Sequence, residues 1–398
     1  MKLSQRVQHL KPSATINIAA KAKQMVANGE HLISFGVGEP DFPTPPHVID
    51  ACIEALQSGK TTYTAAGGIR ELKEAITRKF DRENGLTYSP DQITIGMGAK
   101  HMLYTLFQAI LDPGDELIVL EPYWVSYPEM IKLAGGVPVI ISCREENQFR
   151  ISINDLRHAI TPKTKGIILN SPHNPTGVVY RKDELASIAK LCLENNMLII
   201  SDEIYEHFVY GTKHISIASL SEDVKKHTII INGLSKSHAM TGWRLGYAAG
   251  DAQIIKAMGD LTGQSVSNAV TFVQYAAIAA LDGDQNALKH VVAEYEARRC
   301  YMLERLGEFP GVSAVTPTGA FYIYLNVREL MGKLGYQDVA AFSEALLQEA
   351  KVVVIPGTAF GTADHIRLSY ATSMQNIEEG LNRLHQFIQR STVAHEKN

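Results

Sequence analysis

The 398-residue chain is predicted to be an α/β protein, with a mostly parallel seven-stranded sheet between helices and a second, smaller α+β domain. Three observations predict this fold. Seven short apolar runs alternate with helical segments in the middle of the chain, which is typical of a parallel sheet. The runs are apolar almost throughout, so both faces of their sheet should be covered. From about Asp282 a long amphipathic stretch and separate strands follow instead.

The predicted strands of the large domain come in chain order between residues 92 and 249. They are QITI (92–95), ELIVL (116–120), VPVII (137–141), GIILN (166–170), MLIIS (197–201), TIIIN (228–232) and LGYAA (245–249). Residues 100–111 and 182–196 are predicted helices between them, because apolar side chains recur there at i, i+3 and i+4 spacing.

The smaller domain is predicted from the last third of the chain. It has an amphipathic helix (285–306), strands FYIYLNV (321–327), KVVVIP (351–356) and HIRLSY (365–370), and a closing helix (373–388). The first 45 residues, with clustered prolines at their end, are expected to cross to this unit. We therefore predict a large domain at 46–285 and a small domain at 1–45 and 286–398.

Composition narrows the classes of function. A net charge of −4 and 45% hydrophobic residues indicate neither nucleic acid nor an anionic membrane as a partner. The four cysteines form no C-x-x-C pair, so no metal or redox motif is predicted. No signal-peptide core or apolar run of about 20 residues occurs. These features predict a cytoplasmic enzyme.

Polar motifs follow three of the predicted strands directly. GIILN leads into SPHNPTG, MLIIS into DEIYE, and TIIIN into GLSK. Ligands of parallel sheets bind at the carboxyl ends of strands, so the motifs predict one shared site.

Lys236, in GLSK, is the candidate nucleophile. A lysine amine with its ordinary pKa of about 10.4 is protonated, and burial or a cation such as Arg244 would lower that pKa. A lone loop lysine is more often a solvated surface residue. The small residues around it, Gly233, Ser235 and Gly242, favour close packing instead.

Asp202, Tyr205 and Asn174 are candidate polar partners in this site. Asp202 follows an apolar strand and needs a partner there, or it caps a following helix. Tyr205 could offer a hydroxyl to the same site. Asn174 lies in a loop stiffened by two prolines, which could also be a plain turn. Glu203 and Glu206 are expected to be solvated or salt-bridged.

Two further motifs suit anions. GMGAKH (96–101) places glycines before a helix start, where free N–H groups can bind an anion. Arg367, in HIRLSY, either reaches a carboxylate or forms a structural ion pair. An amine, an aspartate, hydroxyl and amide donors, and a phosphate cradle are together what pyridoxal 5'-phosphate (PLP) requires.

The sequence resembles the class I aminotransferases of PLP fold type I, and most closely the bacterial aspartate and prephenate aminotransferases. The resemblance is carried by GLSKSHAMTGWRLG (233–246), NPTG (174–177), DEIY (202–205), GEPDF (38–42), PYWVSYPEM (122–130) and RLSYA (367–371). These motifs occur in family order and cover nearly the whole chain.

The resemblance implies catalytic roles for three residues. Lys236 would bind the cofactor aldehyde as an imine and then move the proton between the substrate Cα and the cofactor. Asp202 would pair with the pyridine nitrogen. Tyr205, with Asn174, would donate to the phenolate oxygen and lower the pKa of the imine. Trp124 would stack on the ring.

The resemblance also implies how phosphate and substrate are held. Gly98, Ala99 and Lys100, with Arg244, would hold the phosphate, and Arg367 would bind the substrate α-carboxylate. Tyr63 would reach the phosphate of a neighbouring subunit in a homodimer. Gly38 would let the N-terminal segment close over the substrate. Many relatives have a hydroxyl residue where Gly233 stands, and Ser235 is the candidate to compensate.

The predicted reaction is transfer of an amino group from L-aspartate to 2-oxoglutarate. The resemblance implies that Lys11 and Lys100 bind the distal carboxylate, although solvated and helix-start lysines are the simpler explanation. Prephenate or aromatic amino acids are the alternative substrates. A β-C–S lyase or a cyclopropane-forming synthase would keep the same lysine and aspartate. A regulator that senses an amino acid is the weakest hypothesis, because about 40 residues before GEPDF are too few for a DNA-binding domain.

Overall fold

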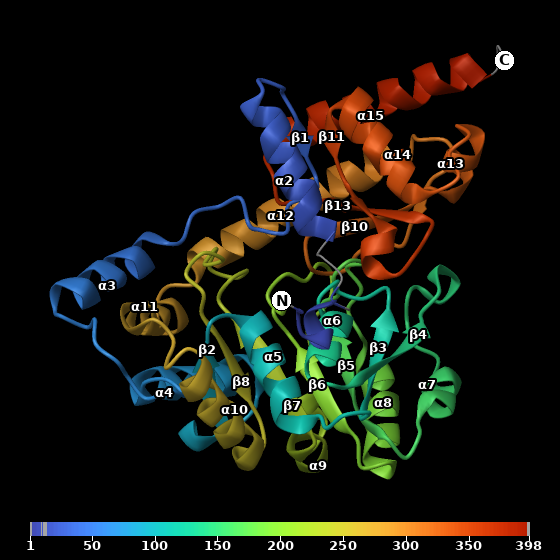
Figure 1. Cartoon of the computed structure of the whole chain (residues 1–398). Coiled ribbons are helices and arrows are strands. Elements are labelled where there is room, and N and C mark those ends of the chain that lie inside the picture. Colours follow the sequence, from blue (N-terminus) through green and yellow to red (C-terminus); the bar gives the residue numbers. More distant parts are fainter. Residues whose placement is uncertain (1, 9, 11–13, 396–398) are drawn as a thin grey trace.

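The computed structural model describes residues 2–8, 10 and 14–395. Seven strands form the central sheet in the order β2-β8-β7-β6-β5-β3-β4 (Figure 1). They are β2 (Ile93–Gly96), β3 (Glu116–Glu121), β4 (Val137–Ser142), β5 (Thr164–Asn170), β6 (Leu198–Asp202), β7 (Thr228–Gly233) and β8 (Gly246–Ala249). β8 is antiparallel to both of its neighbours and the other pairs are parallel. The predicted sheet is therefore confirmed.

Helices cover both faces of this sheet, which explains the apolar runs. Ile168 and Ile200 pack with α5 and α10, whereas their neighbours Ile167 and Ile199 pack on the opposite face with α8. The helices of this domain are α3 (Pro46–Gln57), α4 (Arg70–Lys79), α5 (Ala99–Ile110), α6 (Tyr127–Leu133), α7 (Ile153–Ala159), α8 (Lys182–Glu194), α9 (Glu222–Lys226), α10 (Ala252–Ser265) and α11 (Thr271–Asp282).

The smaller unit contains an antiparallel sheet in the order β12-β13-β10-β9. Its strands are β9 (Ser313–Ala314), β10 (Tyr322–Asn326), β12 (Ile355–Pro356) and β13 (His365–Ser369). Its helices are α12 (Asn286–Leu306), α13 (Arg328–Lys333), α14 (Val339–Ala345) and α15 (Met374–His395). The single strand predicted at 351–356 is two strands, because β11 (Val352–Val353) and β12 pair with different partners.

The N-terminal segment contacts the smaller unit. After α1 (Gln5–Gln8) and α2 (Ala14–Ala27), β1 (Ile33–Ser34) pairs in parallel with β11. The N–H of Phe35 donates to the carbonyl of Val353, and Ser369 N–H donates to the carbonyl of Phe35, at 2.9 and 2.8 Å. These contacts join residues 33–35 to the smaller unit, and the division of the chain at 45/46 and 285/286 stays a prediction.

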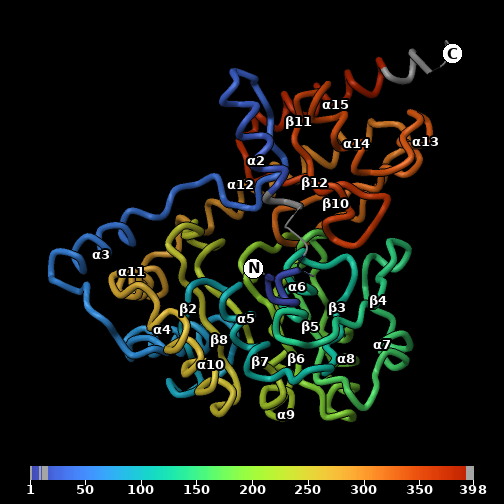
Figure 2. Tube along the Cα trace, viewed as in Figure 1, coloured from blue at the N-terminus to red at the C-terminus, as the bar shows by residue number. Residues whose placement is uncertain are grey.

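The two units face each other across the carboxyl ends of the parallel strands (Figures 1 and 2). Figure 2 shows that the chain after β1 leaves the smaller unit and reaches α3 at the edge of the molecule. In the described part of the chain, every helix is too short or too polar to cross a membrane.

Candidate active site

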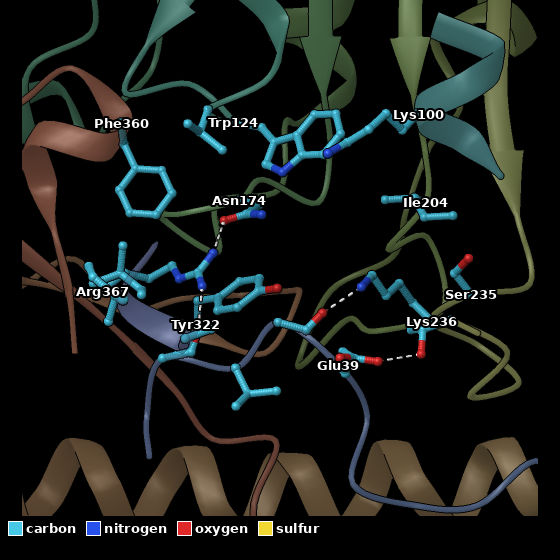
Figure 3. A pocket seen from close by; sticks show the side chains of 18 of the residues that line it. Glu39, Lys100, Trp124, Asn174, Ile204, Ser235, Lys236, Tyr322, Phe360 and Arg367 are labelled. Carbon is cyan, nitrogen blue, oxygen red and sulfur yellow. Dashed lines mark hydrogen bonds between the residues drawn. The ribbon is translucent and has the colours of Figure 1, made fainter. Parts of the chain in front are cut away.

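A cavity of about 610 Å³ lies between the two units (Figure 3). It receives side chains from the ends of β5, β6 and β7, from the start of α5, and from β10 and β13 of the smaller unit. The predicted site residues that line it are Gly38, Ala99, Lys100, Trp124, Asn174, Asp202, Tyr205, Ser235, Lys236, Arg244 and Arg367. The three strand-end motifs therefore meet in one place, as predicted.

Lys236 extends into this cavity from the loop after β7. Its Nζ donates a hydrogen bond to the backbone carbonyl of Gly38, which is neutral (Figure 3). Burial lowers the pKa of Lys236 to about 8, and the cations of Arg367 and Arg244 add to this effect against Glu39 and Asp202. An amine with such a pKa is partly unprotonated near neutral pH and can act as a nucleophile or base.

Asp202 ends β6 at the floor of the cavity. Its Oδ2 accepts a hydrogen bond of 2.6 Å from the hydroxyl of Tyr127, and its Oδ1 accepts one of 3.3 Å from the N–H of Ile204. Burial raises the pKa of Asp202 to about 6, although these hydrogen bonds favour the charged form. Asp202 caps no helix, because a turn follows it.

Asn174 is held by contacts on both sides. Its backbone N–H donates to Oδ1 of Asn170 at 2.9 Å, and Asn170 also donates to the carbonyl of Asp202 at 3.0 Å. The side-chain Oδ1 of Asn174 accepts a hydrogen bond of 3.0 Å from Arg367. Asn170 thus fixes the NPTG loop against the end of β6.

Arg367 lies in β13 and is only 4% exposed. One terminal nitrogen donates to Asn174, and the other donates to the carbonyl of Gly36 at 3.0 Å. Within the described residues, its buried Nε has no hydrogen-bond partner. Arg367 forms no ion pair with a carboxylate among the described residues. The structure therefore does not support the alternative that Arg367 forms a structural ion pair.

The start of α5 forms a cradle for an anion. Gly98 has φ 91°, and a Cβ there would lie 2.5 Å from Nη2 of Arg244. The first N–H groups of a helix have no acceptor within the helix, so they remain available to an anion. Arg244 is fixed by hydrogen bonds to the carbonyls of Thr241 and Met97, at 2.7 and 3.1 Å.

Lys100 and Trp124 lie together at the edge of the cavity (Figure 3). Nζ of Lys100 is 4.8 Å from the centre of the Trp124 ring. Loss of water contacts and the Arg244 cation lower the pKa of Lys100. Its ammonium therefore faces the cavity without a carboxylate partner among the described residues.

The position of Gly233 has a steric explanation. A Cβ at Gly233 would lie 3.0 Å from the carbonyl oxygen of Leu245, so a hydroxyl residue would need the adjacent strand to shift. Ser235 is 7% exposed and lines the cavity beside Lys236. Its contact with a phosphate stays a prediction.

Among the predicted residues that the structure describes, Gly98 and Tyr63 do not line the cavity. Tyr63, between α3 and α4, is 85% exposed. Lys11 lies outside the described residues.

The sequence interpretation missed Tyr127, Asn170 and Tyr322. Tyr127 lies within the motif PYWVSYPEM, and Asn170 ends a predicted strand. Their positions in the sequence could therefore have identified both residues as site candidates. Tyr322 lies inside an apolar strand and carries no such signal. Its hydroxyl is 2.9 Å from that of Tyr205.

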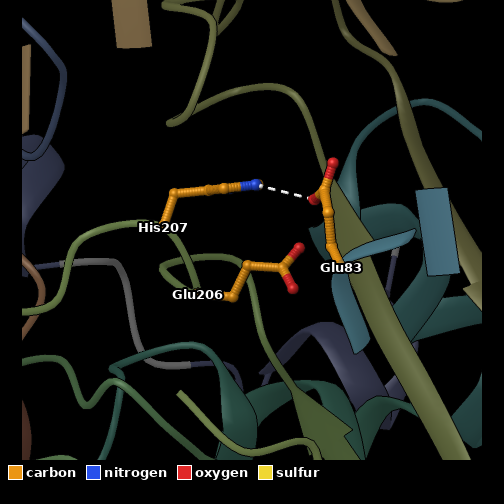
Figure 4. Close-up of side chains that lie close together, drawn as sticks. All are labelled: Glu83, Glu206 and His207. Atoms are coloured by element: carbon orange, nitrogen blue, oxygen red, sulfur yellow. Dashed lines mark hydrogen bonds and ion pairs between the residues drawn. The ribbon is translucent and has the colours of Figure 1, made fainter. Parts of the chain in front are cut away.

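A second polar cluster, outside the cavity, includes Glu83, Glu206 and His207 (Figure 4). Glu206 is 7% exposed, and Lys79, Asn84 and Asn232 all donate to its carboxylate. Burial alone would raise the pKa of Glu206, but Lys79 holds it below its usual value.

Glu203 forms a neighbouring group, in which Ser201 and Ser216 donate to its carboxylate at 2.8 and 2.7 Å. The carboxylates of both groups are thus satisfied within the protein, and we assign the two groups a structural role. The expectation of a salt bridge is confirmed for Glu206, which pairs with Lys79, and Glu203 is fully buried and pairs with His214 at 3.2 Å.

The donor set fits pyridoxal phosphate. The cavity combines an amine, a buried carboxylate and an anion cradle, and it leaves the buried Nε of Arg367 for a further anion. Such a site defines a PLP-dependent enzyme that acts on amino acids.

Comparisons with known proteins agree with this assignment. Residues 30–384 match the family "Aminotransferase class I and II". The chain is 51% identical to an aspartate aminotransferase of Geobacillus stearothermophilus, over 98% of this chain and 99% of the relative. It is 48% identical to a probable aspartate/prephenate aminotransferase of Aquifex aeolicus, over 96% and 97%.

A solved structure shows the same fold. The aspartate aminotransferase of Thermus thermophilus with maleate is 45% identical, with a TM-score of 0.92 over 97% of this chain and 99% of that structure. The chain belongs to the class I and II aminotransferases. It is an aminotransferase, and PLP is its cofactor.

Proposed function

We propose that the enzyme transfers the α-amino group of L-aspartate to 2-oxoglutarate, giving oxaloacetate and L-glutamate. The observation that carries this proposal is the placement of Lys236, Asp202 and Arg367 around one cavity, with the cation of Lys100 at its edge. The relatives named as aspartate aminotransferases support aspartate as the donor.

The roles of the residues follow from their surroundings. Bound PLP supplies a reactive aldehyde and an electron sink. The low pKa of Lys236 would let its amine hold that aldehyde and, once the substrate amine has displaced it, accept and return a proton at the substrate Cα. Asp202, held by Tyr127, offers an anion to the pyridine nitrogen.

The remaining residues bind and orient. Tyr205 and Asn174 donate to the phenolate oxygen, and Trp124 packs on the ring. The start of α5 at Gly98, Ala99 and Lys100 holds the phosphate with Arg244 and, we propose, Ser235.

The substrate carboxylates meet cations in this arrangement. Arg367 binds the α-carboxylate, because its fork is fixed by Asn174 and its Nε is unpartnered among the described residues. Gly38 closes the N-terminal segment over the substrate through its backbone. Lys100, with Lys11, binds the distal carboxylate.

We also propose a homodimer. The side chain of Tyr63 is 85% exposed, so it is accessible to the phosphate of a neighbouring subunit. The four cysteines are free, which fits the reducing cytoplasm.

Two measurements test the reaction. The purified enzyme supplied with PLP should be yellow, and borohydride should fix the cofactor on Lys236, as mass spectrometry of the peptide would show. In a separate sample that has not been treated with borohydride, aspartate alone should convert the cofactor to its pyridoxamine form. Release of ammonia and a keto acid from the amino donor would instead show a lyase.

The substrate is tested with Lys100→Ala. We expect kcat/KM for aspartate to fall about tenfold to a hundredfold, because a charge-assisted hydrogen bond is lost, with a much smaller loss for alanine. Equal losses would exclude this role for Lys100. Prephenate is the second candidate, because relatives carry both names, and a panel of keto acids decides between them.

A further inference from the structure

Tyr322 contacts both Tyr205, which is proposed to bind the cofactor, and Arg367, which is proposed to bind the substrate carboxylate. It starts β10, is 1% exposed and lines the cavity. Its hydroxyl oxygen is 2.9 Å from the hydroxyl oxygen of Tyr205, and its ring lies against the guanidinium of Arg367 (Figure 3).

The hydroxyl of Tyr322 can be assigned a direction. Each tyrosine hydroxyl carries one proton. If Tyr205 donates its proton to the phenolate of the cofactor, as proposed above, the proton between the two tyrosines must come from Tyr322. Donation from Tyr322 then polarises the hydroxyl of Tyr205 and strengthens its bond to the phenolate.

The ring of Tyr322 has a separate function. The guanidinium carbon of Arg367 is 4.3 Å from the centre of the Tyr322 ring and 5.1 Å from that of Phe360. Two aromatic rings and the hydrogen bonds to Asn174 and Gly36 thus fix the plane of the guanidinium. A fixed plane is what bidentate binding of a carboxylate needs.

We propose that Tyr322 is a positioning residue whose hydroxyl orients the donor of Tyr205 toward the cofactor and whose ring orients Arg367 toward the substrate carboxylate. This inference rests on the proposed function, because it takes the cofactor and the α-carboxylate as the two groups that are bound. The hydroxyl should affect the pH titration of the cofactor, and the ring should affect carboxylate binding, so substitutions can separate the two roles.

The hydroxyl is tested by Tyr322→Phe in the PLP-loaded enzyme. The visible absorbance of the cofactor on Lys236 is titrated with pH. A weaker hydrogen bond from Tyr205 to the phenolate should raise the midpoint of this absorbance change by about half to one pH unit. Tyr210→Phe is the matched control, because it removes a buried tyrosine hydroxyl that donates to the carbonyl of Ala320, and it should titrate like the wild type.

The ring is tested by Tyr322→Leu against Tyr322→Phe, with succinate as the probe. Tyr322→Phe keeps a ring against Arg367 and should bind succinate within about twofold of the wild type. Tyr322→Leu should raise the Kd about tenfold, because the contact with the guanidinium is lost. If the leucine variant does not fold, Tyr322→Met takes its place.

The outcomes distinguish the inference from the proposed function. An unchanged transition in Tyr322→Phe overturns the role of the hydroxyl, and equal succinate binding by the phenylalanine and leucine variants overturns the role of the ring. A wild-type enzyme that shows no pH-dependent yellow absorbance would overturn the proposed function itself.

Discussion

Lys79 and Lys236 are two lysine side chains that lie within the protein, and their surroundings differ in one respect. Lys79 is 1% exposed and forms an ion pair with Glu206. Lys236 donates to the carbonyl of Gly38 and, among the described residues, forms no ion pair. The nearby carboxylate of Asp202 is bonded to Tyr127 instead.

The difference shows what makes an enclosed amine reactive. A carboxylate partner favours the charged ammonium and ties the amine into the fold. Without such a partner, burial lowers the pKa, as it does for Lys236. Removing each lysine should therefore have opposite effects on stability and on catalysis.

The largest effect is expected from Lys236→Met. Activity should fall about 10⁴-fold, because the nucleophile and the base are lost together. In cofactor-free protein the same substitution should raise the free energy of unfolding at pH 7 by about 1–3 kcal/mol. Turnover assays and urea unfolding measure the two effects.

The sign of this stability effect follows from the pKa. The folded-state pKa of Lys236, about 8, lies below the ordinary value of about 10.4. The folded state therefore disfavours the ammonium below pH 8, and this penalty disappears as the pH rises toward the ordinary value. A cofactor-free Lys236→Met protein that is less stable than the wild type at pH 7 would contradict the claim that Lys236 destabilises the folded state.

Lys79→Met should give the opposite result. It leaves Glu206 buried without its cation, and the free energy of unfolding should fall by about 3–5 kcal/mol. Activity per folded molecule should stay within about tenfold of the wild type, because Lys79 does not line the cavity. Urea unfolding and turnover, corrected for the folded fraction, measure the two effects.

Two further variants control this result. Lys256→Met breaks an exposed ion pair with Asp260 and should change stability by no more than about 0.5 kcal/mol. Lys79→Met/Glu206→Leu should recover most of the loss, because no unpaired charge remains. If the double variant is as unstable as Lys79→Met, the charge is not the cause.

The loss in Lys79→Met should also depend on pH. Lys79 holds the pKa of Glu206 below its usual value, so the stabilising contribution is present above the ordinary value of about 4.3 and is lost as the pH falls through the folded-state value.

The fold was largely predictable because its signals are local. Each strand of the large sheet is a short apolar run in the sequence, and the alternation of these runs with helical segments locates the strands. The division of 351–356 into β11 and β12 was not predictable, because Val353 pairs with Ser34, far away in the sequence, whereas Ile355 pairs with Arg367. Only the folded chain determines that choice.

The site was predictable where residues follow strand ends or belong to motifs. Lys236, Asp202 and Asn174 are of this kind. The hydrogen bond from Tyr127 to Asp202 and the contact of Tyr322 with Arg367 join residues 75 and 45 positions apart, and no local pattern specifies such pairs. The same is true of Lys79 and Lys236, because the sequence alone does not show which of these two lysines pairs with a carboxylate.

The smallest effect, from Asp202→Asn, extends the comparison to a carboxylate. Burial raises the pKa of Asp202 to about 6, above the ordinary value of about 3.9, so the cofactor-free fold loses stability as the pH rises from about 4 to about 6. The asparagine variant should match the wild type below pH 4 and exceed its free energy of unfolding by about 2 kcal/mol at pH 7. Urea unfolding across this range measures the difference.

Tyr127→Phe tests the same carboxylate, because loss of the hydrogen bond to Oδ2 should raise the pKa of Asp202 in the folded protein above 6. An Asp202→Asn protein that is less stable than the wild type at every pH would mean that Asp202, like Glu206, is held by its neighbours for the sake of the fold and not for the cofactor.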